Sequence, residues 1–309
     1  MARAQQLASF FGALGMVGHA GAGQAQESGG TVLQPSSRWV LDYAETHCRL
    51  VRVFGEGRDQ VTLVLEQYKP SDEVSLTLVG EPLERFGRRD EVDMRFGPLH
   101  SEGRSTPFKT GTFGPPRSTA LIFGGVDFDP AAPDPAAPGE DEAAAMPEVE
   151  DRLPQLQPAT GAQIEWLTIG SGRRAVRLQV GAMGDVFTAL NQCSTDLLRH
   201  WGLDADRHRT LTRMAHPENF PEVARAIQRF YPDAALRAGE QARLEVRMII
   251  EADGSISDCS IAEATSAEYI ESPACREFSR RARFAPALDA EGQPMKSYYS
   301  TGVVYEMGR

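Results

Sequence analysis

The residues best suited to chemistry in this 309-residue chain are four cysteines: Cys48, Cys193, Cys259 and Cys275. A cysteine pair can hold a metal, shuttle electrons or join two structural elements. A redox pair favours the close C-x-x-C spacing, which Cys259 and Cys275 lack. A zinc site needs more ligands than two cysteines supply. The choice between a disulfide and two free thiols therefore depends on the compartment.

The N-terminus predicts export from the cytoplasm. Arg3 precedes the short apolar run 7–17 (LASFFGALGMV), and Gly23-Gln24-Ala25 provides small residues of the kind that a signal peptidase recognises. We therefore expect a signal peptide over residues 1–25, cleaved after Ala25. The alternative is an uncleaved membrane anchor, which takes about 20 predominantly apolar residues. No later segment is apolar for long enough to span a membrane.

An oxidising compartment favours disulfides, and four cysteines allow three pairings. Cys259 is expected on a strand and Cys275 on the apolar face of the following helix. We therefore predict a disulfide between them that joins helix to sheet. Cys48 on an early strand and Cys193 on a later helix form the second predicted pair, with two buried free thiols as the alternative.

Histidines and catalytic motifs give no prediction of an enzyme. His200, His208 and His216 follow steps of eight, a spacing that stacks no ligands on a helix face, so we expect surface or linker histidines and no metal site. The chain lacks G-x-S-x-G, the P-loop motif and H-E-x-x-H. We expect no catalytic residue and no cofactor, with a hydrolase in the N-terminal part of the chain as the alternative.

The charge is unevenly distributed along the chain. The formal net charge is −11, but nine acidic residues lie between Asp127 and Asp151, where Lys and Arg occur nowhere. The remainder of the chain is close to balanced and offers no basic face for nucleic acid. Residues 127–160 are also rich in Pro and Ala, so we expect an extended or disordered acidic loop.

Residues 26–202 predict a β-rich N-terminal module. Runs such as 60–68 (QVTLVLEQY) alternate apolar and polar residues, and Gly-, Pro- and Asp-bearing turns separate them. Residues 183–202 then carry apolar side chains at steps of three and four, which predicts a closing helix. Residues 203–221 are expected to be a linker.

Residues 222–309 predict a second, α+β domain. Helices are expected at 222–230 and 233–240, with Gly239 ending the second. Residues 243–251 alternate as an amphipathic strand, Asp253-Gly254 forms a turn, and the odd step from Ile256 to Cys259 predicts a bulge. Ser272-Pro273 begins another helix, and residues 295–307 form a last strand. We expect the helices on one face of a three-stranded antiparallel sheet.

The last 80 or so residues resemble the C-terminal domain of TonB-type energy transducers. The matching residues are Tyr231-Pro232, Ala235 and Gly239, the strand into Asp253-Gly254, Arg283-Phe284, Pro286-Ala287 and Gly292-x-Pro294. Ala242 departs from the family, which often has a second Gly there. Residues 26–202 resemble no family that we identify.

The resemblance implies a periplasmic domain that binds other proteins, outer-membrane receptors among them, partly by strand addition. An edge strand exposes N–H and C=O groups that an incoming peptide can satisfy. Residues 298–305 are the expected edge, with Tyr298, Tyr299, Val303 and Tyr305 on it and Tyr231-Pro232 nearby as partner contacts. For Tyr231 and Tyr305 the alternative is packing within the domain.

Two functions follow from the resemblance. The first is a periplasmic binding or scaffolding protein without a membrane span after signal cleavage. The second is an inner-membrane-anchored energy transducer whose first 25 residues are retained. The family's long Pro-rich spacer between a membrane helix and the terminal domain has no counterpart here, because the Pro-rich segment belongs to the N-terminal module. This favours the first function.

Overall fold

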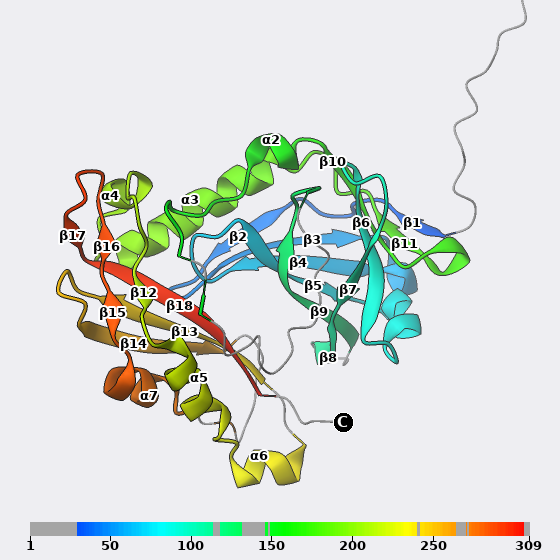
Figure 1. Cartoon of the computed structure of the whole chain (residues 1–309). Helices are drawn as coiled ribbons and strands as arrows, with labels where there is room; N and C mark the ends of the chain where they lie inside the picture. The colour runs from blue at the N-terminus through cyan, green and yellow to red at the C-terminus, as the bar shows by residue number, and fades with distance from the viewer. Residues whose placement is uncertain are drawn as a thin grey trace, which may run out of the picture.

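A computed structural model gives the fold shown in Figure 1. It describes residues 30–113, 118–131, 146–147, 149–239, 242–263, 270 and 272–305. The expected signal peptide and the centre of the acidic loop lie outside these residues. Within the described chain, no helix is long and apolar enough to cross a membrane.

The N-terminal module contains two sheets. The five-stranded sheet is ordered β1 (Thr31–Leu33), β11 (Val176–Leu178), β10 (Ile164–Ile169), β6 (Glu91–Pro98) and β7 (Arg104–Pro107). The six-stranded sheet is ordered β2 (Val40–Tyr43), β3 (Cys48–Phe54), β4 (Val61–Gln67), β5 (Glu73–Val79), β9 (Ser118–Asp127) and β8 (Lys109–Phe113). Short 3₁₀ turns cover Gly57–Asp59, Glu81–Phe86 and Gly172–Arg174.

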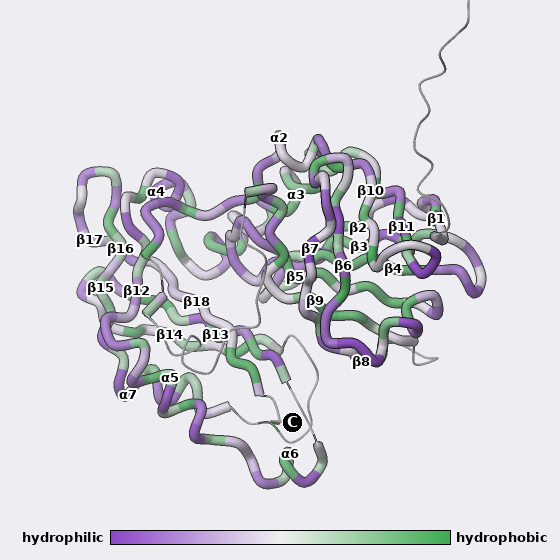
Figure 2. Tube along the Cα trace, turned by 45° about the vertical axis from the view of Figure 1, so that its right-hand side comes forward, coloured by the Kyte–Doolittle hydropathy of each residue, from purple (hydrophilic) through white to green (hydrophobic). Residues whose placement is uncertain are grey.

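One hydrophobic core joins both sheets to helix α3 (Gly184–His200). Leu63 and Leu65 of β4 point into this core, as their alternation predicts, and Leu190 of α3 belongs to the same core. Figure 2 shows hydrophobic segments on β4, β5 and β9. The closing helix expected at 183–202 is therefore present, and Cys48 of β3 forms a disulfide with Cys193 of α3.

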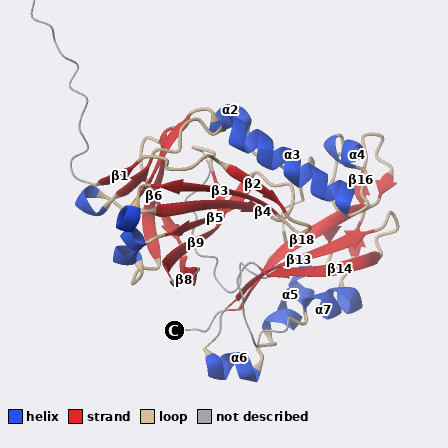
Figure 3. Ribbon diagram, turned by 180° about the vertical axis from the view of Figure 1, so that it is seen from behind, coloured by secondary structure: helices blue, strands red, loops and turns tan. Residues whose placement is uncertain are grey.

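The C-terminal domain has the expected α+β arrangement. Its sheet is ordered β14 (Ile256–Glu263), β13 (Ala242–Ile250) and β18 (Ser297–Tyr305), with antiparallel pairing throughout. Helices α5 (Phe220–Gln228) and α7 (Ala274–Arg281) lie on one face of this sheet (Figures 1 and 3). Helix α6 (Asp233–Ala238) ends at Gly239, whose φ of 69° is the left-handed conformation that glycine adopts readily.

Local details of this domain also follow from the sequence. The pairing of β13 with β14 shifts between Ile249 and Ile250, which is the bulge that the step from Ile256 to Cys259 predicts. Ser272 accepts a hydrogen bond from the backbone N–H of Ala274 at 3.2 Å, so it satisfies a helix-start donor one residue before the assigned cap. Cys259 of β14 and Cys275 of α7 form the second disulfide.

Residues 203–221 differ from the expected linker. They contain α4 (Ala205–Arg209) and β12 (His216–Pro217), which pairs with β15 (Phe284–Ala285). Leu203, Leu211 and Met214 are buried in the core of the C-terminal domain. Their irregular spacing matches neither the helical nor the strand period, so the sequence pattern did not reveal their burial. A short hairpin of β16 (Ala287–Leu288) and β17 (Pro294–Met295) lies alongside.

Both ends of the expected acidic loop are ordered. Phe128 is 3% exposed and packs against Phe96 and Phe187. At the other end Leu156 is buried in the N-terminal core, just before helix α2 (Pro158–Gly161). Residues 132–145 and 148 lie outside the described part of the chain. The sequence composition predicted a loop over residues 127–160. Because Phe128 and Leu156 are buried, the loop is shorter than that at both ends.

Candidate protein-binding edge

The three-stranded sheet has two edges, β14 and β18, with β13 between them. Among the described residues, no strand pairs with the outer side of either edge. An unpaired edge presents a row of backbone N–H and C=O groups that can bind another strand. The sequence-based expectation that the last strand is an edge agrees with this order. Which edge is open to a partner depends on how each is protected.

Strand β14 carries three protecting features. Its side chain Asp258 is exposed and lies 4.0 Å from Arg247, so an incoming strand would meet a charge. The bulge opposite Ile249 and Ile250 interrupts its regular pairing pattern. The Cys259–Cys275 disulfide also fastens the strand to α7. Charges and bulges are common means by which proteins prevent strand addition at an edge.

Strand β18 lacks these features. Its sequence SYYSTGVVY contains no Asp, Glu, Lys, Arg or His, and it pairs with β13 over nine consecutive residues without a shift in register. Val304 near its end is 51% exposed, and Gly302 is exposed. An unshifted, uncharged strand rich in β-branched and aromatic residues is well suited to accept another strand.

Only the second half of β18 is accessible. In the first half, Tyr298 is 2% exposed and packs edge-on against Trp201 at a ring-centroid distance of 5.4 Å. His208 of α4 lies against the same ring, and its Nε2 is 3.0 Å from the Ser297 hydroxyl. Its Nδ1 is 2.6 Å from the carbonyl oxygen of Asp204. The elbow between α3 and α4 therefore covers Ser297 and Tyr298, whereas residues 301–304 are more exposed.

His208 itself departs from the expectation of a surface or linker residue. It is fully buried, and burial lowers the pKa of its imidazole below the usual value of 6.5. Both of its ring nitrogens have partners within the protein. Among the described residues, no group of three or more His, Cys, Asp and Glu side chains is arranged to hold a metal ion.

The aromatic residues expected to contact a partner pack within the domain. Tyr299 lies 5.4 Å from the ring of Phe284 on the helix-bearing face. Tyr305 and Tyr231 meet edge to face at 5.5 Å, and the Tyr305 hydroxyl donates to the Ser272 hydroxyl at 3.1 Å. This is the packing alternative considered for Tyr231 and Tyr305.

The two remaining expected contacts also belong to this packed region. Val303 is half-buried and lies opposite Leu244 of β13. Pro232 is half-buried, and its carbonyl oxygen accepts the N–H of Leu236 at 2.9 Å as helix α6 begins. The side chains of β18 thus mainly support the sheet, and its outer backbone edge is unpaired among the described residues.

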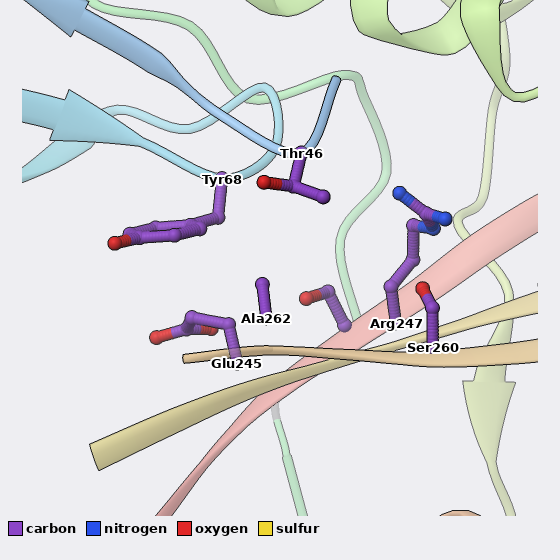
Figure 4. Close-up of a pocket in the computed structure, with 7 residues that line it drawn as sticks. Thr46, Tyr68, Glu245, Arg247, Ser260 and Ala262 are labelled. Carbon is purple, nitrogen blue, oxygen red and sulfur yellow. The ribbon is translucent and has the colours of Figure 1, made fainter. Parts of the chain in front are cut away.

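The sheet face opposite the helices meets the N-terminal module. Figure 4 shows a small pocket there, lined by Thr46 and Tyr68 from the module and by Glu245, Arg247, Ser260, Ala262 and Ser300 from the sheet. Arg247 lies over the Trp201 ring at 4.3 Å, and burial lowers the pKa of its guanidinium. Burial also disfavours the charged form of Tyr68, so it raises the pKa of the Tyr68 hydroxyl. Glu245 accepts from Arg243 at 3.3 Å, so its charge is balanced.

Trp201 and Arg243 are the residues whose roles the sequence did not reveal. Trp201 ends the apolar stripe of α3, which predicted its burial but not its contact with a strand almost 100 residues away. Arg243 is a polar position of an amphipathic strand, and such positions are usually solvated. Its guanidinium instead fills the space that a Cβ atom on Gly124 would need. A glycine in a strand where another group approaches closely is the one sequence feature that hints at this contact.

Comparison with known families gives one match. The model of the Gram-negative bacterial TonB protein C-terminal matches residues 227–307. No curated protein matches the chain. The C-terminal domain is therefore a TonB C-terminal-like domain, which confirms the resemblance seen in the sequence. Such a domain has a non-enzymatic, protein-binding role in the cell envelope of Gram-negative bacteria.

Proposed function

We propose that this protein binds extended segments of other cell-envelope proteins in the periplasm by adding them to the edge of β18. The observation that carries the proposal is the difference between the two edges: β14 is charged, bulged and joined to α7, whereas β18 is uncharged and regular. Strand addition would satisfy the outward N–H and C=O groups of residues 301–304. Outer-membrane transport components are the class of partner that the TonB-like domain favours.

A photo-cross-linking amino acid at two exposed positions tests this proposal. The full chain, produced in a Gram-negative host, carries the cross-linker at Val304 of β18 or at Asp258 of β14. We expect Val304 to give a discrete adduct with an envelope protein and Asp258 to give none. Adducts from Asp258 alone would contradict the proposal, because the partner would then lie on the protected edge.

The proposed compartment is the periplasm, reached by cleavage after Ala25. Two disulfides support an oxidising compartment, since cytosolic proteins rarely keep such bonds. N-terminal sequencing of the native protein distinguishes this from an anchored energy transducer. A start at Gln26 in the soluble envelope fraction agrees with a binding or scaffolding protein. An intact Met1 in the membrane fraction would assign the transducer role instead.

A further inference from the structure

The outer face of the six-stranded sheet, turned away from the N-terminal core, carries an unusual apolar row. Direct cross-strand pairing places Val40, Val51, Val64, Thr77 and Ile122 side by side across β2, β3, β4, β5 and β9. Their sequence neighbours Leu50, Leu63, Leu65 and Leu121 point into the core, so the row points the other way. An antiparallel sheet with one face on a core commonly has a polar second face. Here one row of that face is apolar, with Val40 61% exposed and Val64 7% exposed, while the next row pairs Asp42, Arg49, Glu66 and Ser75 across the same strands.

The same face meets the TonB-like sheet at one end. Tyr68 follows Val64 and Glu66 on this side of β4 and lines the pocket with Glu245 and Arg247 (Figure 4). Burial raises the pKa of Glu73 on β5, and nearby Arg243 offsets this only in part. The apolar row therefore lies one row away from the contact between the two modules, with Glu66 and its ion-pair partner Arg49 between them.

The row begins beside the accessible half of β18. Arg243 lies directly opposite Val304 in the β13–β18 pairing and reaches Gly124 of β9. Ile122 lies two residues from Gly124, which is about 7 Å along a strand. Figures 1 and 3 both show β18 passing beneath the strands of the six-stranded sheet. A strand added to β18 at residues 301–304 would thus lie near the part of β9 that contains Gly124 and Ile122.

The direction of the side chains completes the argument. Residues of β18 at alternate positions point toward the N-terminal module, because Ser300 lines the pocket shared with Thr46 and Tyr68. Gly302 and Val304 follow in this alternation. An added strand has the same pleat, so every second side chain would point toward the apolar row. The five residues of the row are uncharged, and Lys109 of β8 pairs with Ile122 at its end. This fits apolar side chains at the positions that face the five residues.

From this geometry we infer that the row of Val40, Val51, Val64, Thr77 and Ile122 is a second contact surface for the strand that binds β18. It selects an extended segment whose alternate residues are apolar and β-branched. This inference rests on the proposed function and adds the N-terminal module to it: the TonB-like edge supplies backbone pairing, and the valine row supplies side-chain specificity.

Two labelled nine-residue peptides, used with the full chain, test the inference. One alternates Val and Thr between terminal lysines, and the other has Thr at every Val position, which keeps shape and strand propensity. We expect the Val peptide to bind about tenfold more tightly, because it buries additional apolar surface. A Val peptide with N-methylated alternate amides lacks strand pairing and should not bind.

The variant Val40→Lys/Val51→Lys should remove the preference for the Val peptide while retaining binding of the Thr peptide. Val51→Thr is a milder version in case the double variant folds poorly. Val32→Lys, at an exposed valine of the five-stranded sheet, is the matched control and should keep the preference.

Each other outcome is decisive. Equal binding of the two peptides by the wild type overturns the valine row and leaves strand addition in place. Failure of both peptides to bind overturns the proposed function and this inference with it. A concentration-dependent dimer in sedimentation experiments that Val40→Lys/Val51→Lys abolishes would assign the row to a second copy of the chain and also overturn the inference.

Discussion

The two edges of the TonB-like sheet share a central strand but differ in almost every other respect. Strand β14 carries Asp258, a bulge and a disulfide, whereas β18 pairs without a shift and contains no charged residue. An edge without protection favours aggregation unless it has a partner. The difference therefore supports our proposal that β18 binds a partner, and the elbow of Trp201 and His208 limits the accessible part of the strand to its second half.

The largest expected effect concerns the covered half of β18. Tyr298→Ala removes a buried ring that packs on Trp201, so we expect the free energy of unfolding to fall by about 3–5 kcal/mol, as for other large aromatic-to-alanine changes. Urea unfolding followed by tryptophan fluorescence measures it. Tyr43→Ala, at a 57% exposed ring, should change stability by less than about 0.5 kcal/mol. Equal effects would mean that the elbow does not cover β18.

The disulfide of β14 gives the next effect. In Cys259→Ala/Cys275→Ala the free energy of unfolding should fall by about 3 kcal/mol, because the bond closes a short loop in the unfolded chain. Hydrogen exchange should rise in β14 more than in β18. A uniform rise across both edges would show that the bond stabilises the domain without protecting β14 in particular.

A third prediction exchanges the character of the two edges. Val304→Asp places a charge on the open edge, and a bound strand would have to desolvate it. We expect the affinity for the alternating Val/Thr peptide to fall about tenfold. The new carboxylate would protect the edge of β18 as Asp258 protects the edge of β14. Asp258→Val makes the reverse change on β14 and should leave the affinity unchanged. If Asp258→Val strengthens binding and Val304→Asp does nothing, the assignment of the edges is wrong.

The smallest expected effect is a pH dependence at the elbow. Burial lowers the pKa of His208 below 6.5, although the nearby Asp204 raises it in part and Arg207 lowers it further. As the pH falls through 6.5, the unfolded chain takes up the proton first, so the free energy of unfolding decreases. His208→Gln should flatten the profile below pH 6.5. His200→Gln, at an exposed position, should leave it unchanged, and identical profiles for all three proteins would contradict the role of burial.

Local patterns predicted the elements of the TonB-like domain, because its periodicities are regular. The alternation in β13, the glycine that ends α6 and the step that causes the bulge all act within a few residues. The contacts that distinguish the two edges are long-range. The Trp201–Tyr298 and Arg243–Gly124 contacts join segments about 100 residues apart, and no local period encodes them.

Residues 203–221, which the sequence predicted as a linker, also show that local patterns do not predict long-range burial. Leu203, Leu211 and Met214 fill gaps between elements whose positions are set by the rest of the fold. His208 is buried because Ser297 lies opposite it on a distant strand. Its spacing from His200 and His216, which guided the sequence-based expectation, has no bearing on that burial.

The most direct test of the account is amide hydrogen exchange measured by NMR on the full chain, with and without the alternating Val/Thr peptide. The account predicts slower exchange at alternate amides of residues 301–305 on β18 and no change along residues 256–263 of β14. Protection along β14, or protection of neither edge at saturating peptide, would contradict the claim that β18 is the binding edge.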